Sequence, residues 1–184
     1  HLLVVAVSAN TCGERASGTG VLIAPDLVLT AAHVVGDAGL VRIDHQGQVL
    51  TAEVVGVFED GRDLALVTLP APLDPPLPVG STPVLGETVT MVGHPGGGAI
   101  TSIVGSVVDV PSQASIVLRG DLLAVGADAP TGMSGGPAVN DAGEVVGIVV
   151  AAQPGTGKAI VVTFDDVKEL LDAALVDGRC PEVA

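Results

Sequence analysis

The chain has 184 residues, of which 48% are hydrophobic, and 21 acidic residues against 7 Lys and Arg give a formal net charge of −14. This length suits one domain with its own core, and the apolar content excludes a disordered chain. The scattered basic residues provide no stripe for a nucleic-acid backbone, and an anionic membrane surface would repel the domain. We interpret the acidity as a source of solubility.

Residues 1–69 alternate short apolar runs with turn residues, which predicts about six β-strands. Aromatic residues are nearly absent, so Val, Leu, Ile and Ala must fill the core, and the β-branched residues among them favour strands. The predicted strands of this first half are Leu2–Val7, Gly18–Ala24, Leu27–Leu29, Gly39–Ile43, Gln48–Val57 and Leu64–Leu69.

A proline-rich segment follows, with five prolines between Pro70 and Pro78. Such a density cannot join a central strand or a helix. We therefore expect residues 70–85 to form a stiff, extended linker. A proline-rich motif for a partner is the alternative, which the position between two strand-rich blocks disfavours.

Residues 86–163 return to the β pattern without an obvious repeat of the first half. The predicted strands are Thr88–Val92, Ile100–Val110, Ser115–Leu118, Leu122–Val125, Ala138–Asn140, Val145–Ala151 and Ala159–Thr163.

Residues 164–176 predict a terminal helix, which Thr163 or Asp165 can cap. Two strand blocks and one helix predict an all-β protein, and two small barrels side by side would form a cleft at their junction. The apolar face of the predicted helix consists of Val167, Leu170, Leu171 and Ala174, at spacings of three and four.

Acyl transfer from a peptide needs a nucleophile, a base, a group that orients the base, and donors for the oxyanion. The candidate base is His33, which has apolar residues on both sides. The other histidines have weaker contexts, because His1 is terminal, His45 lies in a polar turn and His94 precedes a Pro-Gly pair.

The candidate orienting acid is Asp63, because a half-buried carboxylate at the start of an apolar strand must find a partner. Alternatively Asp63 caps that strand; the neighbouring Asp60 is expected to be solvated. The candidate nucleophile is Ser134, since the small residues around it allow a sharp turn. The amides of Gly132 and Ser134 then form the predicted oxyanion hole.

The chain resembles the trypsin-like superfamily in three motifs, which stand in that family's order: Thr30-Ala-Ala-His33, Asp63-Leu-Ala-Leu and Gly132-Met-Ser134-Gly-Gly-Pro137. Further segments are similar to bacterial HtrA-like proteases: Gly18-Thr-Gly-Val-Leu-Ile-Ala-Pro, Val92-Gly-His-Pro-Gly and Gly147-Ile-Val-Val-Ala. The resemblance implies a chymotrypsin-like fold of two six-stranded antiparallel barrels, with the base and acid on the first barrel and the nucleophile on the second.

The resemblance also implies a substrate site. A strand containing Val149, Val150 and Ala151 would pair with the substrate backbone. Asp128 stands six residues before Ser134, where trypsins line the primary pocket, and would favour Arg or Lys before the cut. Alternatively Asp128 is simply solvated. HtrA-like enzymes carry Asn and trypsins carry Asp where this chain has Met133, so activation by a newly cut N-terminus should be absent.

The two cysteines, Cys12 and Cys180, are expected to form a disulfide in an exported protein, or to remain free thiols in a cytosolic one. No further residues at metal-ligand spacing accompany them, so no metal or cofactor is expected. The lone protease domain and its terminal cysteines also resemble membrane-anchored periplasmic acid-resistance proteases of actinobacteria. This similarity implies an extracytoplasmic location, with membrane contact only through an anchor upstream of His1.

Together these features predict a monomeric serine endopeptidase that cleaves proteins or peptides, without nucleic acid as a partner. A catalytically silent peptide-binding domain that uses the same cleft is the alternative from another class. An esterase acting on other substrates is a third. HtrA-like chains often continue into a peptide-binding module, which is expected here either to be absent or to have been removed.

Overall fold

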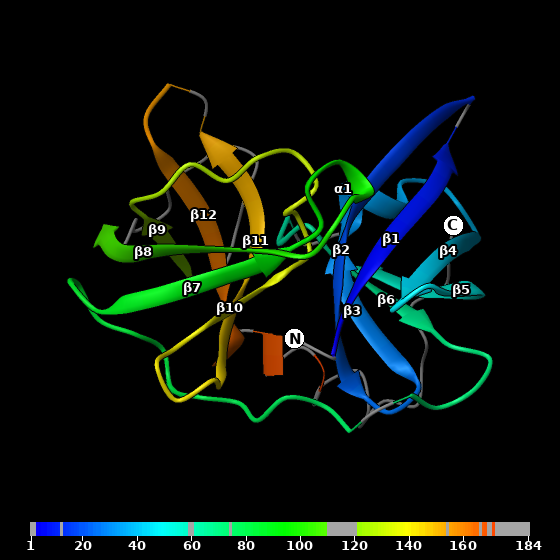
Figure 1. Ribbon diagram of the computed structural model, residues 1–184, viewed down its shortest axis with the longest axis horizontal. Coiled ribbons are helices and arrows are strands. Elements are labelled where there is room, and N and C mark those ends of the chain that lie inside the picture. Colours follow the sequence, from blue (N-terminus) through cyan, green and yellow to red (C-terminus); the bar gives the residue numbers. More distant parts are fainter. Residues whose placement is uncertain are drawn as a thin grey trace.

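Two closed antiparallel barrels of six strands each make up the protein, which confirms the predicted all-β double barrel (Figure 1). The computed structural model describes residues 3–11, 13–58, 61–73, 75–109, 121–153, 155–165, 167–168 and 171. Along each strand the side chains alternate between the interior and the exterior of the barrel, so each barrel encloses its own core.

The first barrel has the strand order β1-β2-β3-β6-β5-β4. Its strands are β1 (Val4–Thr11), β2 (Glu14–Ala24), β3 (Leu27–Ala31), β4 (Leu40–His45), β5 (Gln48–Phe58) and β6 (Leu64–Thr68). A single helical turn, α1 (Ala32–Val35), follows β3 directly.

The hairpin of β1 and β2 is longer than predicted, because pairing continues from Val7–Gly18 to Thr11–Glu14. The predicted first strand ends at Val7, and the residues that follow it are mostly polar. Within this polar extension Ala9 still faces the core and is buried, so the alternation of a half-buried strand persists.

The second barrel has the strand order β10-β11-β12-β9-β8-β7. Its strands are β7 (Thr88–Gly93), β8 (Thr101–Asp109), β9 (Leu122–Val125), β10 (Pro137–Val139), β11 (Val145–Gln153) and β12 (Lys158–Thr163). The 3₁₀ turn η1 (Pro95–Gly97) follows β7. The predicted strand Ser115–Leu118 lies outside the described residues.

Between the barrels, the chain after β6 runs along the bottom of the view in Figure 1 to reach β7. Its described part holds no strand, apart from one isolated bridge between Val79 and Val145. After β12, Phe164, Asp165, Val167, Lys168 and Leu171 are helical. The rest of the predicted terminal helix lies outside the described residues.

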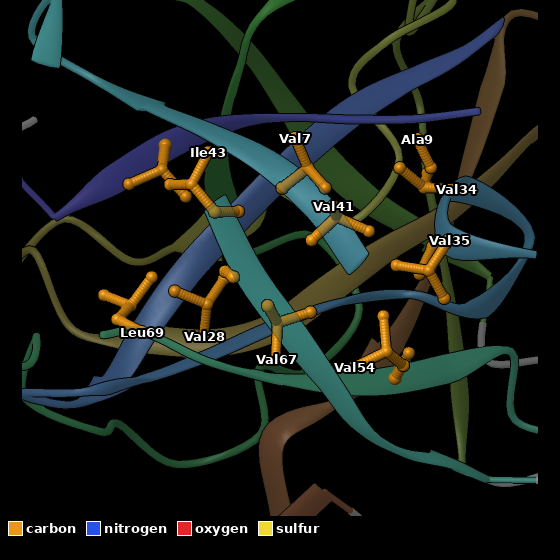
Figure 2. Packing of buried hydrophobic residues seen from close by; sticks show 14 of the residues in the cluster. Val7, Ala9, Val28, Val34, Val35, Val41, Ile43, Val54, Val67 and Leu69 are labelled. Atoms are coloured by element: carbon orange, nitrogen blue, oxygen red, sulfur yellow. The ribbon is translucent and has the colours of Figure 1, made fainter. Parts of the chain in front are cut away.

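Three apolar clusters fill the molecule. The first occupies the interior of the first barrel, where valines from several strands converge (Figure 2). The second cluster fills the second barrel. The third lies between the barrels, where Leu29 and Leu64 of the first barrel join Ile148 and Ile160 of the second, with Phe164 packed against them. Burial of each such side chain contributes roughly 1.5–3 kcal/mol, so this contact fixes how the barrels face each other.

Candidate active site

The predicted base and acid meet on the first barrel. His33 lies on α1 and donates from its ring Nδ1 to Asp63 Oδ2 at 2.6 Å, while its backbone amide donates to Asp63 Oδ1 at 2.9 Å. The backbone carbonyl of Asp63 accepts from the Ala32 amide at 2.9 Å. These hydrogen bonds to Asp63 hold the start of α1 in place and fix the orientation of the imidazole.

Asp63 adopts a left-handed backbone conformation, with φ +57°, directly before β6. Aspartate tolerates this region better than most residues with a side chain. The carboxylate is largely buried, at 18% exposure, whereas the His33 ring is 52% exposed. The acid is therefore largely buried, while the imidazole of the base is accessible.

The pKa of His33 is raised above its ordinary value of 6.5. The hydrogen bond to Asp63 is the main cause, burial acts in the opposite direction, and the negative charge of Asp63 adds to the increase. Since Nδ1 donates to a carboxylate, the neutral imidazole leaves its lone pair on Nε2. This tautomer is the one that a general base needs.

Two consecutive tight turns carry Ser134 on the second barrel. The Met133 amide donates to the Pro130 carbonyl at 3.2 Å, and the Gly136 amide donates to the Met133 carbonyl at 3.0 Å. The third residues of these turns, Gly132 and Gly135, have φ +100° and +87°. A positive φ at that position is the property of a type II turn, which glycine adopts without strain.

Close packing gives a second reason for these glycines. A β-carbon on Gly132 would lie 2.5 Å from the Gly96 amide nitrogen and 2.6 Å from the His94 carbonyl oxygen. One on Gly135 would overlap the Thr19 carbonyl oxygen, and one on Gly136 would overlap the Val92 carbonyl oxygen. The glycines around Ser134 are therefore required sterically.

Both barrels hold the Ser134 loop. The Thr19 amide of β2 donates to the Ser134 carbonyl at 2.8 Å. On the other side, the Gly135 amide donates to the Val149 carbonyl of β11 at 2.7 Å, and the Val149 amide donates to the Gly136 carbonyl at 2.9 Å. The nucleophile candidate thus lies at the junction of the barrels.

Thr19 is a further residue that holds the site together, and it is not among the candidate residues predicted from the sequence. Its buried hydroxyl donates to the Gly132 carbonyl at 2.7 Å and accepts from the His94 amide at 2.8 Å. It therefore fastens the turn before Ser134 to the loop after β7. In the sequence, Gly18-Thr-Gly contributes only to the family resemblance, because one threonine among glycines gives no sign of this long-range contact.

The predicted oxyanion donors are available. Among the described residues, the Gly132 and Ser134 amides have no acceptor, whereas the intervening Met133 amide is engaged. An oxyanion can use two such amides in the same turn. In the described chain, no hydrogen bond joins His33 to the Ser134 hydroxyl. Their elements nevertheless adjoin, because a β-carbon on Gly18 would touch both the Val34 side chain of α1 and the Ser134 carbonyl.

The residues predicted to bind substrate backbone lie on β11. Pairing of β11 with β10 ends at Ile148, while pairing with β12 continues to Gln153. The backbone of Val149 is occupied by Gly135 and Gly136, so within the described residues the open edge starts at Val150 and continues through Ala151. Such an edge can accept an extended peptide.

Asp128 precedes the Ser134 loop and is exposed. Its Oδ1 atom is 3.9 Å from the place of a β-carbon on Gly157, in the turn between β11 and β12. The Asp128 side chain is therefore solvent-exposed beside this turn, as the alternative of a solvated Asp128 describes.

Met133 points into the second barrel, where it is 1% exposed and packs in the core cluster. Its sulfur lies 2.9 Å from the place of a β-carbon on Gly93. Apolar packing thus anchors the residue before Ser134, in place of the polar side chain that the resembled families carry.

The remaining predictions concern the two cysteines, a metal site and contact with a membrane. Cys12 and Cys180 both lie outside the described residues. In the described part of the chain, no three His, Cys, Asp or Glu side chains are grouped closely enough to hold a metal ion. None of the described helices is long and apolar enough to cross a membrane.

The double barrel, the His33–Asp63 pair and the glycine-framed Ser134 turn together define a chymotrypsin-like serine peptidase domain. The family described as the trypsin-like peptidase domain matches residues 18–148. The chain therefore belongs to the trypsin-like peptidase family.

Several proteins of this family are similar to the chain. A probable periplasmic serine endoprotease, DegP-like, of Chlamydia trachomatis is 33% identical over 90% of this chain and 35% of its own length. Serine protease Rv3671c of Mycobacterium tuberculosis is 32% identical over 78% of this chain and 38% of its own length. The chain thus spans little more than a third of these curated relatives.

Solved structures agree with this assignment. The crystal structure of the active form of Rv3671c protease from M. tuberculosis superposes with a TM-score of 0.83 at 27% identity, covering 93% of this chain and 80% of that one. A serine endoprotease from Yersinia pestis gives a TM-score of 0.84 at 26% identity, covering 97% of this chain and 64% of that one.

Proposed function

We propose that the protein is a serine endopeptidase that uses His33, Asp63 and Ser134 as its catalytic triad. The observation that carries the proposal is the 2.6 Å bond from His33 Nδ1 to the largely buried Asp63 carboxylate. It leaves Nε2 as the base at the barrel junction, where the Ser134 turn presents two amides without acceptors. The names of the similar serine proteases support the same activity.

In the proposed mechanism, His33 Nε2 removes the proton from the Ser134 hydroxyl as its oxygen attacks the scissile carbonyl. Asp63 stabilises the imidazolium that forms. The amides of Gly132 and Ser134 donate to the negative oxygen of the tetrahedral intermediate. His33 then gives its proton to the leaving amine, and a water activated by the same imidazole hydrolyses the acyl-enzyme.

The test is labelling by a fluorophosphonate, which reacts with an activated serine, together with cleavage of a peptide library. The wild type and Ser102→Ala, a control on exposed β8, should be labelled and should cleave peptides. Ser134→Ala should do neither. An unlabelled wild type that still binds peptides would instead indicate a silent binding domain.

For the residues N-terminal to the cut, the proposed substrate contacts are the open β11 edge at Val150 and Ala151, with Asp128 beside the β11–β12 turn. Val149 is left out of these contacts, because its backbone already bonds Gly135 and Gly136. We propose that Asp128 favours Arg or Lys immediately before the scissile bond. Its exposure limits the preference to a few-fold, since exposed ion pairs contribute about 1 kcal/mol or less. Asp128→Asn should remove it, and equal cleavage after Leu and Arg by the wild type would refute it.

We also propose an extracytoplasmic location and a Cys12–Cys180 disulfide. The printed names of the similar proteases include periplasmic enzymes, and the chain holds only these two cysteines. A bond closing so long a loop would contribute at most about 5 kcal/mol by chain entropy. Titration of the denatured, unreduced protein should find no free thiol; two reactive thiols would refute the bond and the location inferred from it.

The proposed partners are protein or peptide substrates alone, with no nucleic acid, and with membrane contact only through an anchor upstream. We propose that the domain acts as a monomer. Light scattering after size exclusion should give the mass of one chain, 18.1 kDa. A stable dimer or trimer would contradict this.

A further inference from the structure

A polar groove of about 310 Å³ lies beside the Ser134 loop, on the side away from β11. One wall is the outward face of β1, β2 and β4, which carries Arg15, Ser17 and Arg42. The other wall is η1, through its residues Gly96 and Gly97, and this turn reaches across to the first barrel (Figure 1). The groove therefore spans both barrels.

Backbone hydrogen bonds connect both walls to the nucleophile loop. The Thr19 amide, two residues after Ser17, donates to the Ser134 carbonyl at 2.8 Å. Across the groove, the Gly96 amide donates to the Thr131 carbonyl at 2.9 Å. Since a strand rises about 3.3 Å per residue, Ser17 lies roughly 7 Å along β2 from Thr19. The groove thus begins about two residues of extended chain beyond Ser134.

An open strand edge leads into this groove. β2 pairs with β3 only from Gly20 onward, and among the described strands its segment Glu14–Gly18 pairs only with β1. A peptide that crosses Ser134 from the β11 edge can add to this second edge. Alternate side chains of such a peptide then face the groove, on the same side as Ser17. The β-carbon of Ser17 lies 3.6 Å from the place of a β-carbon on Gly97.

Positive charge is concentrated in the groove. On β1, Asn10 lies opposite Arg15 of β2, and Ser8 lies opposite Arg42 of β4. Since Ser8 and Asn10 are two residues apart in a strand, both arginines lie on the same outward face. The Arg42 guanidinium is 4.0 Å from the Asp44 carboxylate, and the Arg42 side chain is 54% exposed. This ion pair is therefore long, solvated and weak. Within the described chain Arg15 has no ion-pair partner. Two of the seven basic residues of a chain with net charge −14 thus line one small groove.

We propose that Arg15 and Arg42 select substrates with an acidic side chain about two to four residues after the scissile bond. The inference rests on the proposed peptidase function and specifies its substrate class. A guanidinium offers two parallel N–H donors that match a carboxylate, so Asp or Glu fits better than an uncharged residue of equal size. Asp44 on the same face repels a second acidic residue and limits the charge that the groove accepts.

The test uses fluorogenic peptides that are randomised before the cut and carry Glu, Gln or Lys at the second, third and fourth positions after it. The wild type should cleave Glu peptides roughly two- to fivefold better than Gln peptides for each charged contact, measured as kcat/KM at low salt. In 1 M NaCl the preference should shrink towards one. Arg15→Gln and Arg42→Gln should each reduce it, and Arg15→Glu should reverse it in favour of Lys.

Lys168→Gln is the matched control, because it removes one exposed positive charge on the helical segment after β12. It should keep the wild-type preference. Equal cleavage of Glu and Gln peptides by the wild type would overturn the groove inference and leave the peptidase function standing. Failure of the wild type both to cleave any peptide and to react with a fluorophosphonate would overturn the proposed function itself.

Discussion

The substitution Asp63→Asn tests the proposed triad with the least change in shape. Asparagine has the same size and tolerates the left-handed backbone at this position, where φ is +57°. Its side-chain oxygen can still accept from the His33 backbone amide, as Oδ1 does at 2.9 Å. Only the 2.6 Å contact to the ring changes, because an NH₂ group then faces Nδ1.

That single change prevents His33 from acting as the general base. An NH₂ donor requires Nδ1 to be the acceptor, so the ring proton moves to Nε2, and Nε2 can no longer take a proton from Ser134. The loss in kcat should be about 10⁴-fold, as for the corresponding change in other Ser-His-Asp enzymes. This equals about 5 kcal/mol of activation free energy. The free energy of unfolding should change by only about 1 kcal/mol, because the pair is partly solvated.

The assay is single-turnover cleavage of a fluorogenic peptide across pH, with thermal unfolding measured in parallel. Asp26→Asn, in the exposed turn between β2 and β3, removes the same charge far from the site and should retain full activity. If Asp63→Asn kept more than a tenth of the wild-type kcat while remaining folded, Asp63 would not orient the base, and the triad would need another acid.

Three further predictions concern the same loop and base. Gly135→Ala should destabilise the fold by more than Gly143→Ala, because both have a positive φ but only the first β-carbon meets other atoms; equal urea midpoints would contradict the packing argument. Met133→Ala should cost about 2–5 kcal/mol of unfolding free energy, since Met133 fills the second core; a loss under 1 kcal/mol would mean that the site collapses freely. Wild-type kcat/KM should rise with pH as His33 loses its proton, with a midpoint above 6.5 because Asp63 raises the pKa of His33. The stabilisation of the fold by the His33–Asp63 pair is fully present below pH 6.5 and is lost as pH rises through the raised pKa of His33. A midpoint of the kcat/KM profile below pH 6.5 would contradict the pairing.

Local patterns in the sequence determined much of the fold. The apolar strand of Leu64–Thr68 and the alternation in Gln48–Phe58 follow directly from residue order, because side-chain direction alternates every residue in a strand. The glycines around Ser134 also follow from local chemistry, since a positive φ strongly favours glycine. These features need no knowledge of distant partners.

Pairing across the chain was decided by the tertiary structure alone. Sequence order could not place Thr19 against Gly132, because that contact depends on how the two barrels pack. Nor could it bring Arg15 and Arg42 to one groove beside η1, because their positions depend on the pairing of β1 with both β2 and β4. The orientation of Met133 into the core and the exposure of Asp128 have the same origin. A side chain's burial is set by the elements that cover it, and β9, β11 and β12 are neighbours only in the closed second barrel, not in sequence order.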